Sequence, residues 1–245
     1  MALSIMQTLA LDRILEPGLR VASLGYPDII APMPLIERML GGKIGELGYR
    51  ADSEEICRRH GLKQRQIPDA HSMFSVLGCK LDVYDIVQER GCEIICDLNH
   101  RLDPKFKAFN YDIVLDVGTV EHCFNIGQAM MNMAGMVKHN GYIIHENPHN
   151  CSNHGFYNLN PTFYADFYAA NGFELLECKL ATRDGSSVDV PRTQRFKFTE
   201  LEVNVFAMAK RTSIQTFVMP VQSKYAKLIP AAGVPGENMK EATNG

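Results

Sequence analysis

The chain has 245 residues, of which 46% are hydrophobic and 22% are charged, and its formal net charge is −3. This length and composition are typical of a globular protein with one large domain or two small ones. The small negative charge makes a nucleic-acid partner unlikely, and no apolar run is long enough to span a membrane. The opening residues have an early acidic residue and no basic leader, so we expect a cytoplasmic protein.

The seven cysteines are odd in number and scattered along the chain, and several lie in apolar runs. We expect them to be reduced thiols that pack as small hydrophobic side chains. The CxxxC spacing of Cys92 and Cys96 gives little reason to expect a metal, because Cys96 ends a strand-like run.

The first predicted strand is Arg20 to Leu24, and an amphipathic helix precedes it. The strand leads into Gly25-Tyr26-Pro27-Asp28, where the missing Cβ of Gly25 would let a ligand approach the backbone. Residues 29–72 then separate this strand from the next crossover helix, far more than the roughly 10–12 residues that a crossover needs. We predict two short helices in this insertion, which would form a lid over the site.

Three further apolar runs each end on an acidic residue. They cover residues 79–86, 92–96 and 111–116, and the acids are Asp85, Asp97 and Asp116. One acid after a strand is a common helix cap. Three acids in series at one edge of a parallel sheet instead favour a ligand with hydroxyl and amino groups, because ligands bind at the carboxyl ends of such strands.

The stretch Tyr111 to Asn125, YDIVLDVGTVEHCFN, carries the strongest site signal. A buried strand stops at a polar loop, and Asn125 is placed to cap a helix that runs through Val137 and ends at Asn140-Gly141. The next strand is predicted at 142–145. This βαβ unit places the loop residues at the carboxyl edge of the sheet, where we expect the chemistry: Gly118, Thr119, Glu121 and His122.

A histidine-rich loop, ENPHNCSNHGFYNLNP, follows this strand. Its residue types invite a zinc interpretation through His145, His149, Cys151 and His154. The segment passes from strand into loop, so these side chains need not converge, and we predict no metal site. We expect His149, His154 and Tyr157 to contact the substrate instead.

Asn160 and Pro161 begin another helix, after which strands are predicted at 173–180 and 203–209. No helix separates these two strands, so they should pair antiparallel. Residues 212–245 are predicted to be a C-terminal extension that could bind a protein partner. Residues 1–211 would form one α/β domain, whose seven-stranded sheet is parallel except for the last strand and has helices on both faces.

Seven strands that alternate with helices until a final antiparallel hairpin resemble the class I, Rossmann-like S-adenosylmethionine-dependent methyltransferases over about residues 20–211. The most specific part of the resemblance is local: VYDI at 83–86, CDLN at 96–99, GTVEHCFN at 118–125 and HGFYNLNP at 154–161. These stretches are similar to motifs of a bacterial and viral branch of that family. The family's glycine-rich first loop, usually GxGxG, is here LGYPD with one glycine.

The resemblance implies that S-adenosylmethionine is the cofactor. It implies that Gly25 and Tyr26 lie beside the cofactor at the end of the first strand. Asp85 would accept both hydroxyls of the ribose, as a carboxylate can. Asp97 and Leu98 would flank the adenine, with the acid near its exocyclic amine.

The resemblance also places the reacting groups. Val117, Gly118 and Thr119 would pass beside the methionine portion of the cofactor. Glu121 and His122 would face the transferred methyl as the catalytic residues. Histidine is a suitable base near neutral pH, but methyl transfer also proceeds on proximity and alignment, so His122 could instead orient the acceptor.

Two other functions remain open at this stage. The single glycine of LGYPD and the C-terminal extension would suit a catalytically inactive methyltransferase-fold scaffold or assembly subunit. A nicotinamide-dependent oxidoreductase is disfavoured because GxGxxG is absent. For an active enzyme, the His, Asn and aromatic side chains of the two loops favour a small-molecule or glycan acceptor.

Overall fold

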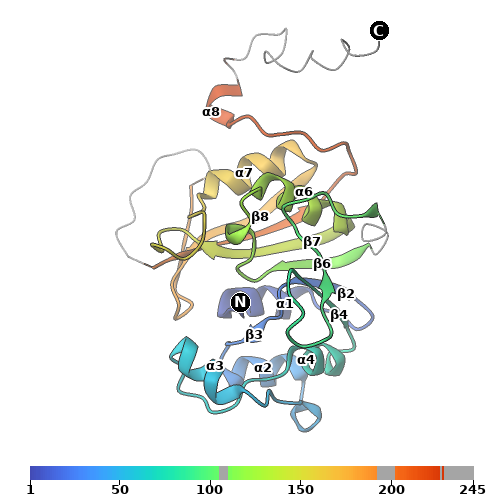
Figure 1. Cartoon of the computed structure of the whole chain (residues 1–245), viewed down its shortest axis with the longest axis vertical. Coiled ribbons are helices and arrows are strands. Elements are labelled where there is room, and N and C mark those ends of the chain that lie inside the picture. Colours follow the sequence, from blue (N-terminus) through green and yellow to red (C-terminus); the bar gives the residue numbers. More distant parts are fainter. Residues whose placement is uncertain (105–109, 192–201, 227, 229–245) are drawn as a thin grey trace.

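The computed structural model of the protein describes residues 1–104, 110–191, 202–226 and 228. The strands of the main sheet are β2 (Arg20–Leu24), β4 (Lys80–Asp85), β5 (Ile94–Ile95), β6 (Tyr111–Asp116), β7 (Val137–Pro148), β8 (Phe173–Ala181), β9 (Ser187–Asp189) and β10 (Asn204–Arg211). Their order across the sheet is β5-β4-β2-β6-β7-β10-β8-β9 (Figure 1). A separate two-stranded parallel sheet joins β1 (Ala2–Leu3) to β3 (Asp28–Ile29).

The directions of the strands confirm the expected hairpin but not the expected strand number. Strands β5, β4, β2, β6 and β7 are parallel, and β10 is antiparallel to both β7 and β8. The prediction of seven strands is wrong, because β9 adds an eighth strand, antiparallel to β8. It has three residues, all exposed, which is shorter than the roughly four to eight residues over which alternation of apolar and polar residues marks a half-buried strand.

The predicted boundary between the central helix and the following strand is also wrong. Helix α6 (Ile126–Met136) ends four residues before Asn140, and β7 begins at Val137, which pairs with Tyr111 of β6. The pairing shifts register before Tyr142, and Asn140 adopts a φ of 64° within this irregularity. Asn140-Gly141 therefore forms a bulge inside a long strand rather than a helix stop.

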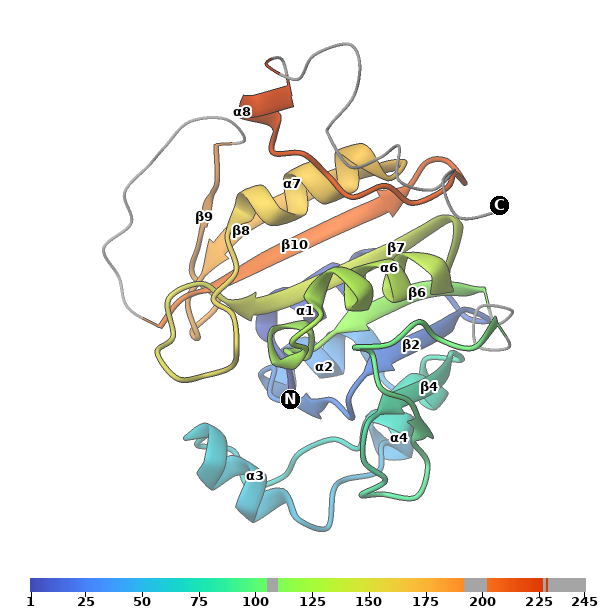
Figure 2. The same ribbon diagram turned by 45° about the horizontal axis from the view of Figure 1, so that its top comes forward.

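Helices cover both faces of the sheet (Figure 2). The remaining helices are α1 (Ile5–Ile14), α2 (Met33–Leu40), α3 (Ser53–His60), α4 (Ala70–Val76), α7 (Pro161–Ala170), α8 (Ser223–Ala226) and the 3-10 turns η1 (Ile44–Glu46) and η2 (Val120–His122). Strand β10 shows the division: Val205 and Ala207 pack in the core with α6 and α7, whereas Phe206 and Met208 pack with α1, α2 and α4.

The segment predicted as a lid, residues 29–72, has two differently packed parts. Ile36 and Leu40 of α2 are buried in the same core cluster as β2. Residues Ile56 and Ile67, in and after α3, belong to a small cluster of their own. Only the second part is thus independent of the main core.

The first part of the C-terminal extension lies along α7. The side chain of Asn171 accepts a hydrogen bond from Val218 N at 2.9 Å and donates one to Val218 O at 3.1 Å. Gln215 donates to the carbonyl of Ala170 at 2.8 Å. These bonds tie residues 212–218 to the domain, whereas residues 227 and 229–245 of the predicted extension lie outside the described residues.

In the part of the chain that the structure describes, no helix has both the length and the apolar character required to cross a membrane.

Candidate functional site

The strand order reverses between β2 and β6, because β4 follows β2 on one side and β7 follows β6 on the other. Ligands of open α/β sheets bind at the carboxyl ends of the strands at such a reversal. Gly25 follows β2 with a φ of 84°, and Gly118 follows β6 with a φ of 88°. Both conformations lie in the left-handed region that favours glycine, so each of the two strands ends at a turn that needs this residue.

A methionine side chain covers Gly25. A Cβ built on Gly25 would lie 1.9 Å from the sulfur of Met1, which means that the thioether rests directly on the glycine. The hydroxyl of Thr119 lies 3.2 Å from the same sulfur. Ala2 N donates to the carbonyl of Val117 at 3.2 Å, so the first residues of the chain cross from the end of β2 to the end of β6.

The acids after β4 and β5 each cap a local turn with one oxygen. Asp85 Oδ1 accepts from the next two backbone N–H groups at 2.7 and 3.3 Å. Asp97 Oδ1 accepts from the backbone and the side chain of Asn99 at 2.9 and 2.8 Å, and these bonds lower the pKa of Asp97. The neighbouring Leu98 is buried in the core. In both carboxylates, the second oxygen takes no part in these capping hydrogen bonds.

Tyr26 lies in the core that contains α1, α2 and α4. Its hydroxyl donates to Asp69 Oδ2 at 2.6 Å, and the guanidinium of Arg90 lies 4.3 Å from the ring centroid. Burial and the hydrogen bond to Asp69 raise the pKa of Tyr26. Its side chain is therefore committed to the protein interior, and only its backbone is placed to meet a ligand beside Gly25.

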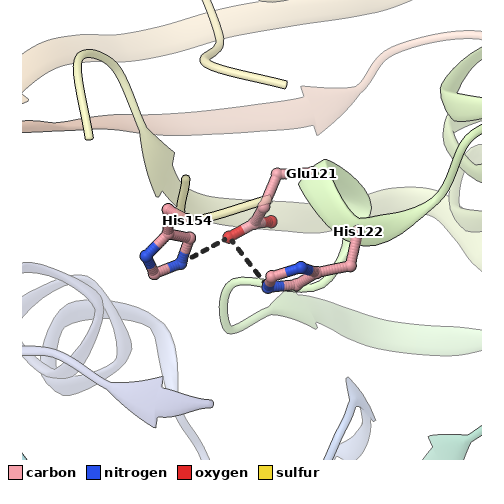
Figure 3. A group of neighbouring side chains, drawn as sticks. All are labelled: Glu121, His122 and His154. Carbon is pink, nitrogen blue, oxygen red and sulfur yellow. Dashed lines mark ion pairs between the residues drawn. The ribbon is translucent and has the colours of Figure 1, made fainter. Parts of the chain in front are cut away.

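Glu121, His122 and His154 form a cluster at the end of β6 (Figure 3). Glu121 is fully buried, whereas the two imidazoles are about half exposed and stack with centroids 5.5 Å apart. Glu121 Oε1 lies 3.5 Å from His154 Nε2 and 4.0 Å from His122 Nε2. The Glu121 carboxylate raises the pKa of His154. Nothing in the spacing of residues along the sequence predicted that His154 lies beside Glu121.

A buried hydrogen-bond network supports Glu121 from behind. Asn147 Nδ2 donates to Glu121 Oε2 at 2.9 Å and to Asp116 Oδ2 at 2.8 Å, and Asn147 Oδ1 accepts from the hydroxyl of Tyr164. Asp116 Oδ2 also accepts from His145 Nδ1 at 2.8 Å. Burial raises the pKa of Tyr164 well above its ordinary value, so this hydroxyl stays protonated and donates.

This network was missed at the level of sequence, although one signal was present. Asp116 ends β6 and is paired with His145 of the neighbouring strand β7. His145 Nε2 lies 2.5 Å from the hydroxyl of Tyr168, and His145 is fully buried. His145 is therefore part of the support and is not available to a ligand.

The loop after β7 closes over Glu121. Phe156 N donates to Glu121 O at 2.9 Å, and the hydroxyl of Tyr157 donates to Phe124 O at 2.7 Å. Phe124 and Phe156 are 72% and 65% exposed, and their rings meet edge to face with centroids 5.5 Å apart. Two large aromatic side chains exposed together beside a polar cluster offer a surface on which a ligand could stack.

The structure separates the two histidines of this loop. His154 joins the cluster with Glu121, whereas His149 Nδ1 donates to the carbonyl of Leu159 at 2.8 Å. Among the expected substrate residues, His154 thus faces the cluster, and His149 and Tyr157 hold the loop in shape.

No family model matches this chain, and no curated protein does. Several solved structures are weakly similar to it. TehB from Haemophilus influenzae has 12% identity and a TM-score of 0.39, over 84% of this chain and 62% of that one. The trans-methyltransferase CalH, in complex with SAH, has 13% identity and a TM-score of 0.45, over 83% of this chain and 54% of that one. This chain thus spans about three fifths of the length of TehB and about half of the length of CalH.

A third overlap is with the complex of the Haloferax volcanii Trm112 methyltransferase activator and a candidate methyltransferase. It has 12% identity and a TM-score of 0.45, over 84% of this chain and 88% of that one. At these identities and TM-scores, no activity, substrate or partner can be transferred from the three proteins to this chain.

Proposed function

We propose that the protein is an S-adenosylmethionine-dependent methyltransferase whose acceptor is a neutral polar small molecule or a glycan. The observation that carries this proposal is the pair of left-handed glycines, Gly25 and Gly118, at the strand ends where the sheet order reverses. Asp85 ends the adjacent strand β4. Two strand-end glycines beside a carboxylate suit a ligand with a long chain and a sugar.

The surface over Gly25 fits the methionine portion of such a cofactor. It already accepts a methionine side chain, that of Met1, whose sulfur rests on the glycine and near Thr119. Val117 and Gly118 would border the same chain on the side of β6. Met1 must leave this position before the cofactor can bind there, so we propose that the segment Met1–Leu3 moves on binding.

The acids would hold the nucleoside. Asp85 uses Oδ1 for its turn, and its other oxygen would accept from the ribose hydroxyls. Asp97 would accept from the adenine amine with the oxygen that Asn99 does not use, and Leu98 would pack against the ring. Tyr26 would contribute its backbone alone, because its side chain is buried.

The acceptor would bind between His122, His154 and the aromatic pair Phe124 and Phe156. Glu121 and His122 border this position, and the exposed rings would stack on the apolar face of a sugar or on an aromatic ring. The part of the 29–72 segment around α3, which has its own small core, is the part that would close as a lid.

Calorimetry with S-adenosylmethionine and S-adenosylhomocysteine tests the proposal. One molecule should bind per chain, and Asp85→Ala should weaken binding at least tenfold, because hydrogen bonds to a charged group contribute about 1.5–3 kcal/mol each. Asp189→Ala, at the exposed end of β9, is the matched control and should leave affinity unchanged. Absence of binding to the parent at millimolar ligand would overturn the proposal in favour of the scaffold function.

A further inference from the structure

Three potential ligand atoms converge at the end of β6 (Figure 3). Glu121, His122 and His154 each offer one ligand atom, and these three atoms lie within 4.8 Å of one another. Two atoms bound to the same zinc ion at about 2.0–2.2 Å in tetrahedral geometry lie about 3.4 Å apart. The 3.5 Å between Glu121 and His154 already has this spacing, and the 4.0 Å to His122 needs a small rotation of a half-exposed ring.

The buried oxygen at the centre of the cluster lacks a hydrogen-bond partner. Among the residues that the structure describes, no donor reaches Glu121 Oε1, although the side chain is completely buried. At 3.5 and 4.0 Å the imidazole nitrogens are too distant for good hydrogen bonds. A buried carboxylate oxygen without a partner is costly, and a cation held between the three side chains would remove this cost.

The residues around the cluster hold Glu121 in one orientation and leave space beside it. Asn147 and, behind it, Tyr164 fix the other oxygen of Glu121, which sets the direction of Oε1. Such outer partners orient the carboxylates that ligate metals. Two glycines leave the space: a Cβ on Gly118 would lie 3.2 Å from Glu121 Oε1, and one on Gly155 would lie 3.1 Å from His122 Nδ1.

We infer that Glu121, His122 and His154 bind one divalent transition-metal ion of the zinc and cobalt type. Imidazole and carboxylate ligands suit such ions, and three protein ligands with open coordination positions are the pattern of catalytic rather than structural sites. The open positions face solvent beside Phe124 and Phe156, because both imidazoles are half exposed. The sequence suggested a different ligand set, His145, His149, Cys151 and His154, and we expected no metal because that segment passes from strand into loop. The structure commits His145 and His149 elsewhere.

The ion would give the proposed acceptor site a means of selecting its ligand, and this consequence rests on the proposed function. An acceptor with a hydroxyl group would bind the open position through its oxygen. A divalent ion lowers the pKa of a bound hydroxyl, so the metal would both orient and activate the acceptor. The ion would neither orient nor activate an acceptor that has no oxygen atom to bind it.

Cobalt titration tests the site directly. The full chain, freed of metal with EDTA, is titrated with Co²⁺ in the absence of cofactor, and its visible absorption is followed. One ion should bind per chain, without the sulfur-to-cobalt charge-transfer band that a cysteine ligand would produce. His154→Ala and His122→Ala should each weaken binding at least tenfold, since even the loss of an outer-shell partner costs 10–100-fold.

The control is His139→Ala, an exposed histidine whose side chain bonds to Thr212 O and lies outside the cluster. It should bind cobalt like the parent, and circular dichroism verifies that every variant is folded. No saturable binding up to millimolar Co²⁺ would overturn the inference, as would equal affinity of His154→Ala and the parent. Cofactor calorimetry in EDTA separates the two proposals: cofactor binding without cobalt binding defeats the metal site alone, and the reverse result defeats the methyltransferase proposal alone.

Discussion

The sulfur of Met1 lies where a Cβ on Gly25 would stand, 1.9 Å from that position. The contact joins the first residue of the sequence to the first turn of the main sheet. It is supported on both sides, because Asp28 N donates to Met1 O at 3.1 Å and Ala2 N donates to Val117 O at 3.2 Å. The proposed function assigns the same surface to the cofactor, so cofactor binding there would require Met1 to move.

Gly25→Ala is expected to destabilise the fold more than Gly18→Ala. Both glycines have a positive φ, 84° and 92°, and an alanine in the left-handed region costs about 1–2 kcal/mol at either position. Nothing lies within 4 Å of a Cβ on Gly18, whereas at Gly25 the side chain of Met1 must also move. Urea unfolding measures the difference. Equal losses in the two variants would show that Met1 does not rest on Gly25.

Asn147→Ala is expected to lower the free energy of unfolding by about 2–4 kcal/mol, because it leaves Glu121 Oε2 without a donor and the buried hydroxyl of Tyr164 without its acceptor. Asn158→Ala, in the loop after β7, removes only an exposed bond from Cys151 N and should cost less than about 1 kcal/mol. Denaturant unfolding at neutral pH compares them. If Asn147→Ala is as stable as Asn158→Ala, the network does not support the site as described.

Asp28→Asn should destabilise the protein at neutral pH but not in acid. Burial alone would raise the pKa of Asp28, but the hydrogen bond from His60 at 3.3 Å and the charge of Arg50 lower it below the ordinary value. A folded-state pKa below the unfolded one stabilises the fold above the unfolded pKa of about 3.9, and this contribution disappears as the pH falls through the folded pKa. The parent should therefore lose its advantage over Asp28→Asn below about pH 4.

The size of this effect distinguishes a buried pair from a surface pair. Breaking a buried pair costs about 3–5 kcal/mol, whereas exposed pairs contribute about 0–1 kcal/mol. Asp12→Asn removes the partner of the exposed Arg38 and serves as the control. The unfolding free energies of the parent and both variants are measured from pH 3 to pH 7. At pH 7, Asp28→Asn should be several kcal/mol less stable than the parent, and Asp12→Asn should not. A pH-independent difference would contradict the assignment.

His122→Gln is expected to lower methyl transfer by about 10²–10⁴-fold while cofactor affinity stays nearly unchanged. The imidazole borders the proposed acceptor position and lies 4.0 Å from Glu121 Oε1. The assay follows labelled methyl from the cofactor into the acceptor, with His139→Gln as control. A raised Michaelis constant with an intact pH profile would make His122 an orienting residue. Loss of cofactor binding would place it in the cofactor pocket instead.

Local chemistry explains what could be predicted from the sequence. Strand β2 was predicted with its bounds, and the caps at Asn125 and Asn160 accept the expected backbone N–H groups. The antiparallel last strand followed from the missing crossover. These features depend on residues close together in the chain.

The unpredicted features depend on distant contacts. The pairing of β1 with β3 involves two residues on each strand, which is too short for a periodic pattern. Tyr26 was placed correctly at the end of β2, but nothing in the sequence tells that its side chain turns inward to Asp69. His154 and Glu121 meet because the loop after β7 folds back through the bond from Phe156 N to Glu121 O.

A crystal structure of the chain with saturating S-adenosylhomocysteine would locate the cofactor. We expect the ligand to lie across the ends of β2, β4 and β6, with its ribose on Asp85 and its amino-acid chain over Gly25 and Gly118. Met1 should be displaced from Gly25. If Met1 still rests on Gly25 with no ligand beside it, or if the ligand binds at another place, the proposed cofactor site is wrong.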